Sequence, residues 1–142
     1  MTRFADPDAR WRPPKGNAHG GKREDLGGLY MRSTMEANFA RYLAWLKAHG
    51  AIQDWRHEPE EFWFDGIKRG TRSYLPDFRV TENNGAVVYY ETKGYMDPVS
   101  RTKLRRMAKY HPEIKIVVVG REEYAEIRKK VGAMVPGWEE AT

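Results

Sequence analysis

The sequence feature that most constrains the fold is a β-hairpin centred on residues 82–85. These residues read Glu-Asn-Asn-Gly, and Asn and Gly tolerate the positive φ angles that tight hairpin turns require. The flanking runs, residues 74–80 and 86–93, contain aromatic and β-branched side chains that favour extended strands. We therefore expect two antiparallel strands joined by this turn, with Gly94 ending the second strand.

Three helices are predicted around this hairpin. Ser33 is a good N-cap for the first one, and Glu36 follows three positions later, as in a capping box. Apolar residues then repeat at helical spacing until Gly50, which suits the C-terminal end of a helix. The three helices are expected at residues 34–49, 98–110 and 122–131.

Further strands predict a mixed α/β architecture. Strand-like runs occupy residues 52–57 and 61–64. Residues 114–119 form a nearly continuous apolar run, which suits a strand buried on both faces and paired in parallel. The order of helix, antiparallel strands, helix, strand and helix predicts a single α/β domain with a mixed central sheet over residues 31–142.

Residues 1–30 are predicted to form an arm outside this domain. Pro7, Pro13, Pro14 and several glycines interrupt the segment, and no apolar period is sustained in it. The arm carries several Lys and Arg side chains. Two interpretations stay open, a disordered tail and a basic arm that clamps phosphates.

The composition excludes several classes of protein. The 142 residues include no cysteine, which excludes disulfides, thiolate zinc sites and a cysteine nucleophile. No apolar stretch approaches the ~18 residues of a membrane span, and no secretory signal peptide is visible. Lys and Arg number 25 against 20 Asp and Glu, and the net charge of +5 favours a polyanionic partner.

Chemically useful side chains converge at one end of the predicted hairpin. Alternation along the second strand places Glu91 and Lys93 on the same face. Asp77, preceded by Pro76, then lies opposite the Glu91 end if the hairpin pairs in its simplest register. Two carboxylates hold Mg²⁺ beside a phosphate, and a lysine adds charge for the phosphate or orients a water. This set predicts phosphodiester hydrolysis.

Structural roles compete with this interpretation. Glu91 and Lys93 also suit a surface ion pair worth under about 1 kcal/mol. Asp77 after Pro76 also suits a plain turn, and Glu36 suits a helix cap alone. The placement of these residues on strand, turn and strand, between an acidic and a basic helix, favours the catalytic interpretation.

The motif Pro76-Asp77 followed by Glu91-Thr92-Lys93 resembles the signature of the PD-(D/E)XK nucleases. Within that superfamily, residues 32–119 resemble the phage endonuclease I family, which resolves Holliday junctions. The stretches that carry this resemblance are Arg32-Ser33-x-x-Glu36, Tyr74-x-Pro76-Asp77-Phe78, Asn84-Gly85, Glu91-Thr92-Lys93-Gly94, Asp97, Arg101, Lys103 and His111-Pro112-Glu113. The chain departs from that family in a longer insert between Asp77 and Glu91.

The resemblance implies a restriction-endonuclease-like fold, two divalent metal ions and a homodimer. It implies that Glu36, Asp77, Glu91 and Lys93 are catalytic. The three carboxylates, with the backbone carbonyl of Thr92 as an additional ligand, are expected to hold Mg²⁺, for which Mn²⁺ substitutes. We expect no small-molecule cofactor, no membrane partner and a cytoplasmic location in a bacterial or phage-infected cell.

Basic side chains around this motif are expected to contact the DNA backbone. They lie in the arm, in a loop before Asp77 and along the second helix: Lys22, Arg23, Arg32, Lys68, Arg69, Arg72, Arg101, Lys103, Arg105, Arg106 and Lys109. The resulting hypothesis is a Mg²⁺-dependent DNA endonuclease that prefers branched DNA. Two alternatives remain, a nuclease for ordinary duplex or DNA ends and a non-catalytic nucleic-acid-binding protein of the same fold. No histidine is assigned to catalysis.

Overall fold

A four-stranded mixed sheet forms the centre of the protein, whose computed structural model describes residues 19–140. The strand order is β3, β6, β7 and β8. The pairs β3–β6 and β6–β7 are antiparallel and β7–β8 is parallel. These strands span β3 Asp54–His57, β6 Phe78–Thr81, β7 Val87–Thr92 and β8 Ile116–Val119. The predicted mixed α/β class is thus confirmed.

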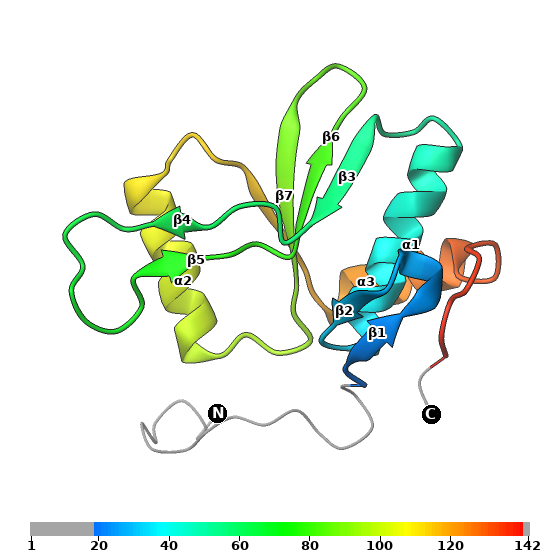
Figure 1. The fold of residues 1–142 in the computed structure, drawn as a ribbon, viewed down its shortest axis with the longest axis horizontal. Helices are drawn as coiled ribbons and strands as arrows, with labels where there is room; N and C mark the ends of the chain where they lie inside the picture. The colour runs from blue at the N-terminus through cyan, green and yellow to red at the C-terminus, as the bar shows by residue number, and fades with distance from the viewer. Residues whose placement is uncertain (1–18, 141–142) are drawn as a thin grey trace.

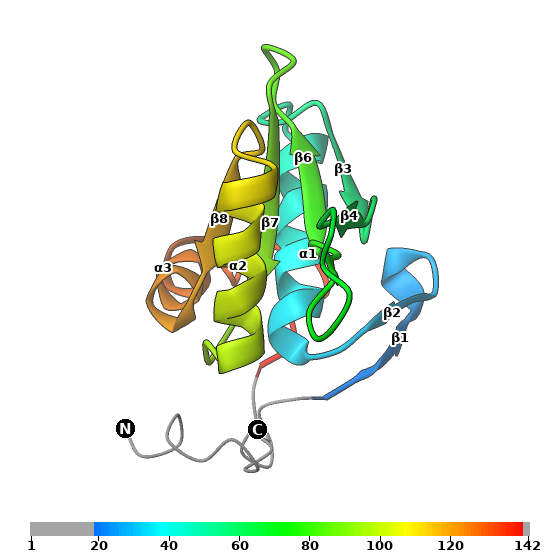
Figure 2. The ribbon, with the colours of Figure 1, turned by 90° about the vertical axis from the view of Figure 1, so that its left-hand side faces the viewer.

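Helices cover both faces of this sheet (Figures 1 and 2). Helix α1, Thr34–Ala48, lies on one face together with α3, Arg121–Val131. Helix α2, Pro98–Tyr110, lies on the other face, with the small sheet of β4, Phe62–Trp63, and β5, Ser73–Tyr74. All three helices start and end within two residues of the positions predicted from the sequence. None of the helices among residues 19–140 is long and apolar enough to cross a membrane.

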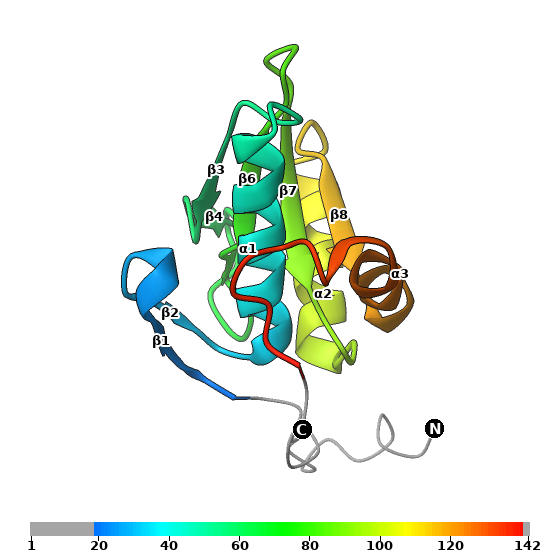
Figure 3. The same cartoon turned by 90° about the vertical axis from the view of Figure 1, so that its right-hand side faces the viewer.

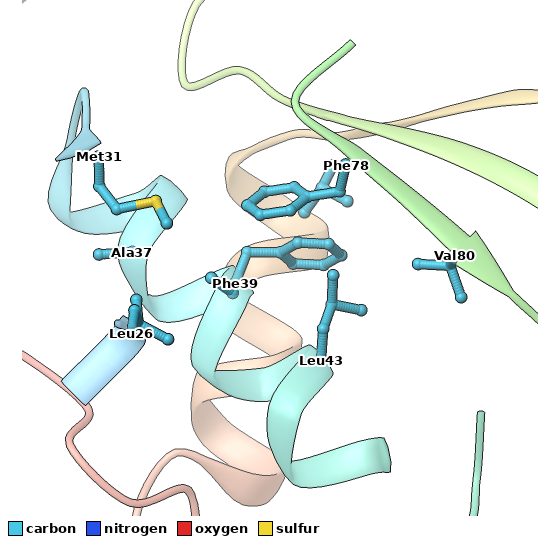
Figure 4. Close-up of a cluster of buried hydrophobic side chains, with 9 residues drawn as sticks. Leu26, Met31, Ala37, Phe39, Leu43, Phe78 and Val80 are labelled. Atoms are coloured by element: carbon cyan, nitrogen blue, oxygen red, sulfur yellow. The ribbon is translucent and has the colours of Figure 1, made fainter. Parts of the chain in front are cut away.

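The main core lies between α1 and the sheet (Figure 4). Phe39 of α1 contacts Phe78 of β6 and Tyr90 of β7, with ring centroids 5.4 and 5.5 Å apart. Leu43 and Val80 extend this cluster along the helix and the strand. A smaller core on the opposite face includes three buried side chains, Phe64, Tyr74 and Met107.

The predicted hairpin is confirmed, and its first strand is divided in two. The amide of Gly85, which has φ +87°, donates to the carbonyl of Glu82 in the turn. Residues 75–77 separate β5 from β6. Pro76 lacks the N–H that a strand ladder needs, which explains the interruption directly before Asp77.

The expected parallel pairing of residues 114–119 is confirmed, but burial on both faces is not. The strand β8 lies at the edge of the sheet, and the side chains of Ile116, Val117 and Val118 are half-buried. The apolar run instead contributes to both cores. Ile116 packs against the smaller core on the α2 side, and Val119 belongs to the main core on the α1 and α3 side.

The N-terminal arm is shorter than predicted. Residues 21–31 form a ribbon of β1, Gly21–Arg23, a single turn of 3₁₀ helix, Glu24–Leu26, and β2, Leu29–Met31. Leu26 and Met31 are buried in the main core, which explains why this polar segment folds. Residues 1–18 of the expected arm lie outside the described residues.

Buried Arg41 joins the ribbon, α1 and the C-terminal segment, which runs across α1 in Figure 3. Its guanidinium group donates to both carboxylate oxygens of Asp25, at 2.7 and 3.0 Å, and lies 3.1 Å from Glu139. Arg23 contacts the same Glu139 carboxylate at 2.5 Å. This network holds two ends of the described chain against one helix.

We expect Arg41→Ala to lower the free energy of unfolding by about 2 kcal/mol, because removing the buried guanidinium breaks its hydrogen bonds to the Asp25 carboxylate and to Asn38. Urea unfolding followed by circular dichroism measures the change. Lys47→Ala is the matched control, because its 2.9 Å ion pair with Asp54 is exposed and should contribute less than about 1 kcal/mol. Equal effects of the two substitutions would show that the network does not stabilise the ribbon.

Candidate active site

The β6–β7 register brings the two hairpin carboxylates together as predicted. Phe78 pairs with Tyr90, so Asp77, directly before β6, lies opposite Glu91. Glu36 joins them from the first turn of α1. All three side chains are buried, with exposed fractions of 3% for Asp77, 8% for Glu91 and 2% for Glu36.

Neutral donors hold the two hairpin carboxylates in place. Asp77 Oδ2 accepts hydrogen bonds from the backbone N–H and the hydroxyl of Thr92, at 2.9 and 2.8 Å. Glu91 Oε1 accepts from the hydroxyl of buried Tyr74 at 2.8 Å. These contacts fix the orientation of both carboxylates without adding a positive charge.

Glu36 is bound differently from a helix-capping residue. Its own N–H donates to the Ser33 hydroxyl, which confirms Ser33 as the N-cap. Its carboxylate Oε2, however, accepts from the backbone N–H of Arg32 at 2.6 Å. Its second oxygen, Oε1, lies 3.7 Å from Nε2 of His57. The Glu36 carboxylate also lies near enough to Asp77 for its charge to raise the pKa of Asp77.

The three carboxylates repel one another electrostatically. Burial raises the pKa of Asp77 well above its ordinary value, and the charges of Glu91 and Glu36 raise it further. Burial also raises the pKa of Glu91, although the Tyr74 hydrogen bond and Lys93 partly oppose that rise. For Glu36, burial alone would raise the pKa, but His57 and the Arg32 N–H lower it below the ordinary value. Burial and mutual repulsion thus disfavour full ionisation of Asp77 and Glu91 unless a cation offsets the charge.

This donor set fits a hard divalent cation that keeps part of its water shell. Among residues 19–140, no group of three or more His, Cys, Asp or Glu side chains is placed so that it could hold a metal ion by itself. Mg²⁺ does not need one, because it binds through one or two carboxylates plus water and phosphate oxygens. The buried Asp77–Glu91 pair supplies those carboxylates, and Glu36 adds charge beside them.

A cavity of about 60 Å³ opens beside Glu91 between β7 and α2. Three cationic side chains line it, Arg32, Lys93 and Lys103. Lys93 Nζ lies 3.6 Å from Asp97, whose carboxylate caps α2 by accepting from the N–H of Ser100 at 2.7 Å. A cationic cavity next to a carboxylate pair suits a phosphate group whose oxygens also reach a metal ion.

The remaining predicted DNA-binding residues divide into two groups. Exposed side chains occur on the ribbon (Lys22), on the loop between β4 and β5 (Lys68, Arg69 and Arg72) and along α2 (Arg101, Arg105 and Lys109). Arg23 and Arg106 instead make contacts within the protein, and their assignment to DNA binding stays a prediction. Arg23 is bound by Glu139 and the carbonyls of His19 and Gly21, and Arg106 donates to the carbonyl of Thr71.

Sequence reasoning missed several residues of the site. The sequence indicates Tyr74 and Asp97 only as parts of a motif, yet in the structure the Tyr74 hydroxyl donates to Glu91 and Asp97 lies 3.6 Å from Lys93. His57, to which no role was assigned, lies beside Glu36 with 5% of its side chain exposed. The antiparallel pairing of His57 with Phe78 places it there. No turn signal in the sequence indicates this register.

No protein-family model and no curated protein matches the chain. The assignment of this site therefore depends on its geometry and on the motif in the sequence.

We expect Asp77→Asn to stabilise the metal-free protein at neutral pH, because the amide removes a charge that burial and the neighbouring carboxylates of Glu91 and Glu36 disfavour. A carboxyl whose pKa is raised on folding binds more protons when folded, so wild-type stability should fall as pH rises above the ordinary pKa of Asp. The advantage of Asp77→Asn should shrink toward low pH. Urea unfolding in chelator at several pH values measures it, with exposed Asp65→Asn as control. A less stable Asp77→Asn variant at neutral pH would contradict this electrostatic account.

Proposed function

We propose that this protein is a divalent-metal-dependent nuclease that hydrolyses phosphodiester bonds in DNA. The observation that carries the proposal is the buried pair Asp77 and Glu91, set opposite each other across β6 and β7. Lys93 is the first residue after β7, and its side chain lines the adjacent cationic cavity. The resemblance of the sequence to the PD-(D/E)XK signature supports the same chemistry, and we include the restriction-endonuclease-like fold in the proposal.

Each residue of the set has a defined role in the proposed reaction. Asp77, Glu91 and Glu36 would hold Mg²⁺ or Mn²⁺, with the Thr92 carbonyl as a further proposed ligand. When bound, the metal polarises the phosphoryl oxygen and acidifies a water. Lys93 neutralises charge that develops on the phosphate. In the reaction, the attacking water gives up a proton to solvent as its oxygen bonds to phosphorus, the bond to the leaving oxygen breaks, and that oxygen receives a proton.

Branched DNA is the proposed substrate. The exposed basic residues of α2 and of the β4–β5 loop suit contacts with phosphates, which read backbone shape instead of base sequence. A junction-resolving enzyme makes two symmetric cuts, so we propose a homodimer. The complete set of Asp77, Glu91 and Lys93 favours an enzyme over a non-catalytic binding protein of the same fold. We further propose that the protein acts in the cytoplasm.

The proposal is tested by cleavage of a four-way junction and a linear duplex of equal length, each with Mg²⁺ and with excess chelator. We expect cleavage of the junction with Mg²⁺ and none in chelator, because the carboxylates need the cation to approach a phosphate. Full activity in chelator would overturn the metal-dependent mechanism. Absence of cleavage for every DNA, with binding retained, would favour the non-catalytic alternative.

We expect Lys93→Ala to lower the single-turnover cleavage rate about a hundredfold or more, as loss of a charge contact in the transition state does. Junction affinity should change little, because many other cations contact the backbone. Lys130→Ala is the matched control, since this lysine is exposed on α3 and pairs only loosely with Glu126, at 3.5 Å. Loss of binding with an unchanged rate for the bound complex would assign Lys93 to affinity instead.

We expect the junction to compete better than linear duplex for binding, because the duplex offers the same charges without the branch. Affinity for both should fall steeply with salt, since each neutralised phosphate releases a counterion. Gel-shift competition at fixed salt, paired with light scattering for mass, measures these properties. A monomer with equal affinity for both DNAs would leave the nuclease proposal in place and remove the junction-specific one.

A further inference from the structure

His57 carries a buried nitrogen that the proposed nuclease mechanism does not use. It is the last residue of β3, and 5% of its side chain is exposed. Its Nε2 has no hydrogen-bond partner among the described residues. The nearest acidic atom, Oε1 of Glu36, lies 3.7 Å away, which is too far for a hydrogen bond. The nitrogen and the oxygen thus face each other across a short gap.

A buried polar atom without a partner is costly, so native proteins satisfy such atoms with water or an ion. The gap between His57 and Glu36 is slightly longer than the roughly 3.0–3.4 Å that separates two ligands with ~2.1 Å bonds to one ion. Glu36 already uses its other oxygen for the Arg32 N–H. Oε1 and Nε2 are therefore the two donor atoms left for a shared cation.

The other ring nitrogen of His57 also faces a carboxylate. Its Nδ1 lies 3.8 Å from a carboxylate oxygen of Glu58. In metal-binding histidines the second nitrogen usually donates a hydrogen bond to a carboxylate, whereas Nδ1 of His57 faces the Glu58 carboxylate from just beyond hydrogen-bond distance. Glu58 is the only non-glycine residue with positive φ, +45°, among residues 19–140, and its N–H donates to the carbonyl of Asp77 at 2.7 Å. The other oxygen of the Glu58 carboxylate pairs with the guanidinium group of Arg32.

A packing role is the alternative explanation. The His57 ring lies 5.4 Å from the ring of Phe78, within the range of ordinary aromatic contacts. Packing accounts for burial of the ring but not for the direction of both nitrogens toward carboxylates. The two explanations differ in whether Nε2 bonds to a metal ion.

We propose that Nε2 of His57 and Oε1 of Glu36 together ligate a divalent cation beside the Asp77–Glu91 pair. This inference rests on the proposed function, which supplies the assumption that the site binds a divalent metal ion. An imidazole nitrogen binds first-row transition ions better than Mg²⁺ or Ca²⁺, which prefer oxygen ligands. The site next to Glu36 should therefore favour Mn²⁺ over Mg²⁺, whereas the Asp77–Glu91 pair accepts both.

The test is pulsed electron paramagnetic resonance on the full chain with Mn²⁺ and without DNA. We expect nitrogen modulation from a directly bound imidazole in the wild type and its loss in His57→Gln. We also expect His57→Gln to weaken Mn²⁺ binding at least about tenfold in calorimetry, while Mg²⁺ binding changes less than about threefold. His49→Gln is the matched control, because this exposed histidine follows α1, about 20 Å along the helix from Glu36.

Absence of nitrogen modulation in the wild type at saturating Mn²⁺ would overturn the inference, and this measurement needs no variant to fold. Modulation that persists in His57→Gln would overturn it as well. The inference and the proposed function fail separately. DNA cleavage without a nitrogen signal removes the His57 ligand and keeps the nuclease, whereas a nitrogen signal without any DNA cleavage keeps the metal position and removes the nuclease.

Discussion

The pairing of Phe78 with Tyr90 is the interaction on which the core and the candidate site both depend. It points the Phe78 ring into the cluster around Phe39, and it sets Asp77 opposite Glu91. A shift of one residue would turn Phe78 out of the core and Asp77 away from its partner. The free energy of core packing therefore maintains a carboxylate pair that would otherwise separate by repulsion.

Neutral hydrogen-bond donors allow these carboxylates to be buried and still bind a cation. Thr92 and Tyr74 orient Asp77 and Glu91 without neutralising them, and the Arg32 N–H does the same for Glu36. If lysine or arginine side chains formed close ion pairs with all three carboxylates, their negative charge would be neutralised and the site would attract a metal ion only weakly. The guanidinium group of Arg32 forms an ion pair with Asp77 at 3.6 Å and offsets part of this charge, although much of the Arg32 side chain is exposed. This arrangement lowers the stability of the metal-free protein, but it leaves carboxylates that a cation can bind.

Local signals explain what could be predicted from the sequence. The turn at Asn84-Gly85 determines the hairpin and with it the positions of Asp77 and Glu91, while Ser33 determines where α1 begins. The ribbon of β1 and β2 could not be predicted, because its folding depends on Leu26 entering the core and Asp25 reaching Arg41, more than ten residues away. His57 was missed for a similar reason, since only its long-range pairing with Phe78 brings it to Glu36.

The direct connection between the ribbon and Glu36 links folding of the N-terminal segment to the chemistry of the site. The strand β2 ends at Met31, and the next residue, Arg32, donates the N–H that holds the Glu36 carboxylate. If the ribbon detached, this donor would move with it and Glu36 would lose its orientation. By thermodynamic linkage, a cation that requires an oriented Glu36 must in turn favour the attached ribbon. Residues 21–31, although remote from the hairpin in sequence, thus become part of the energetics of whatever binds there.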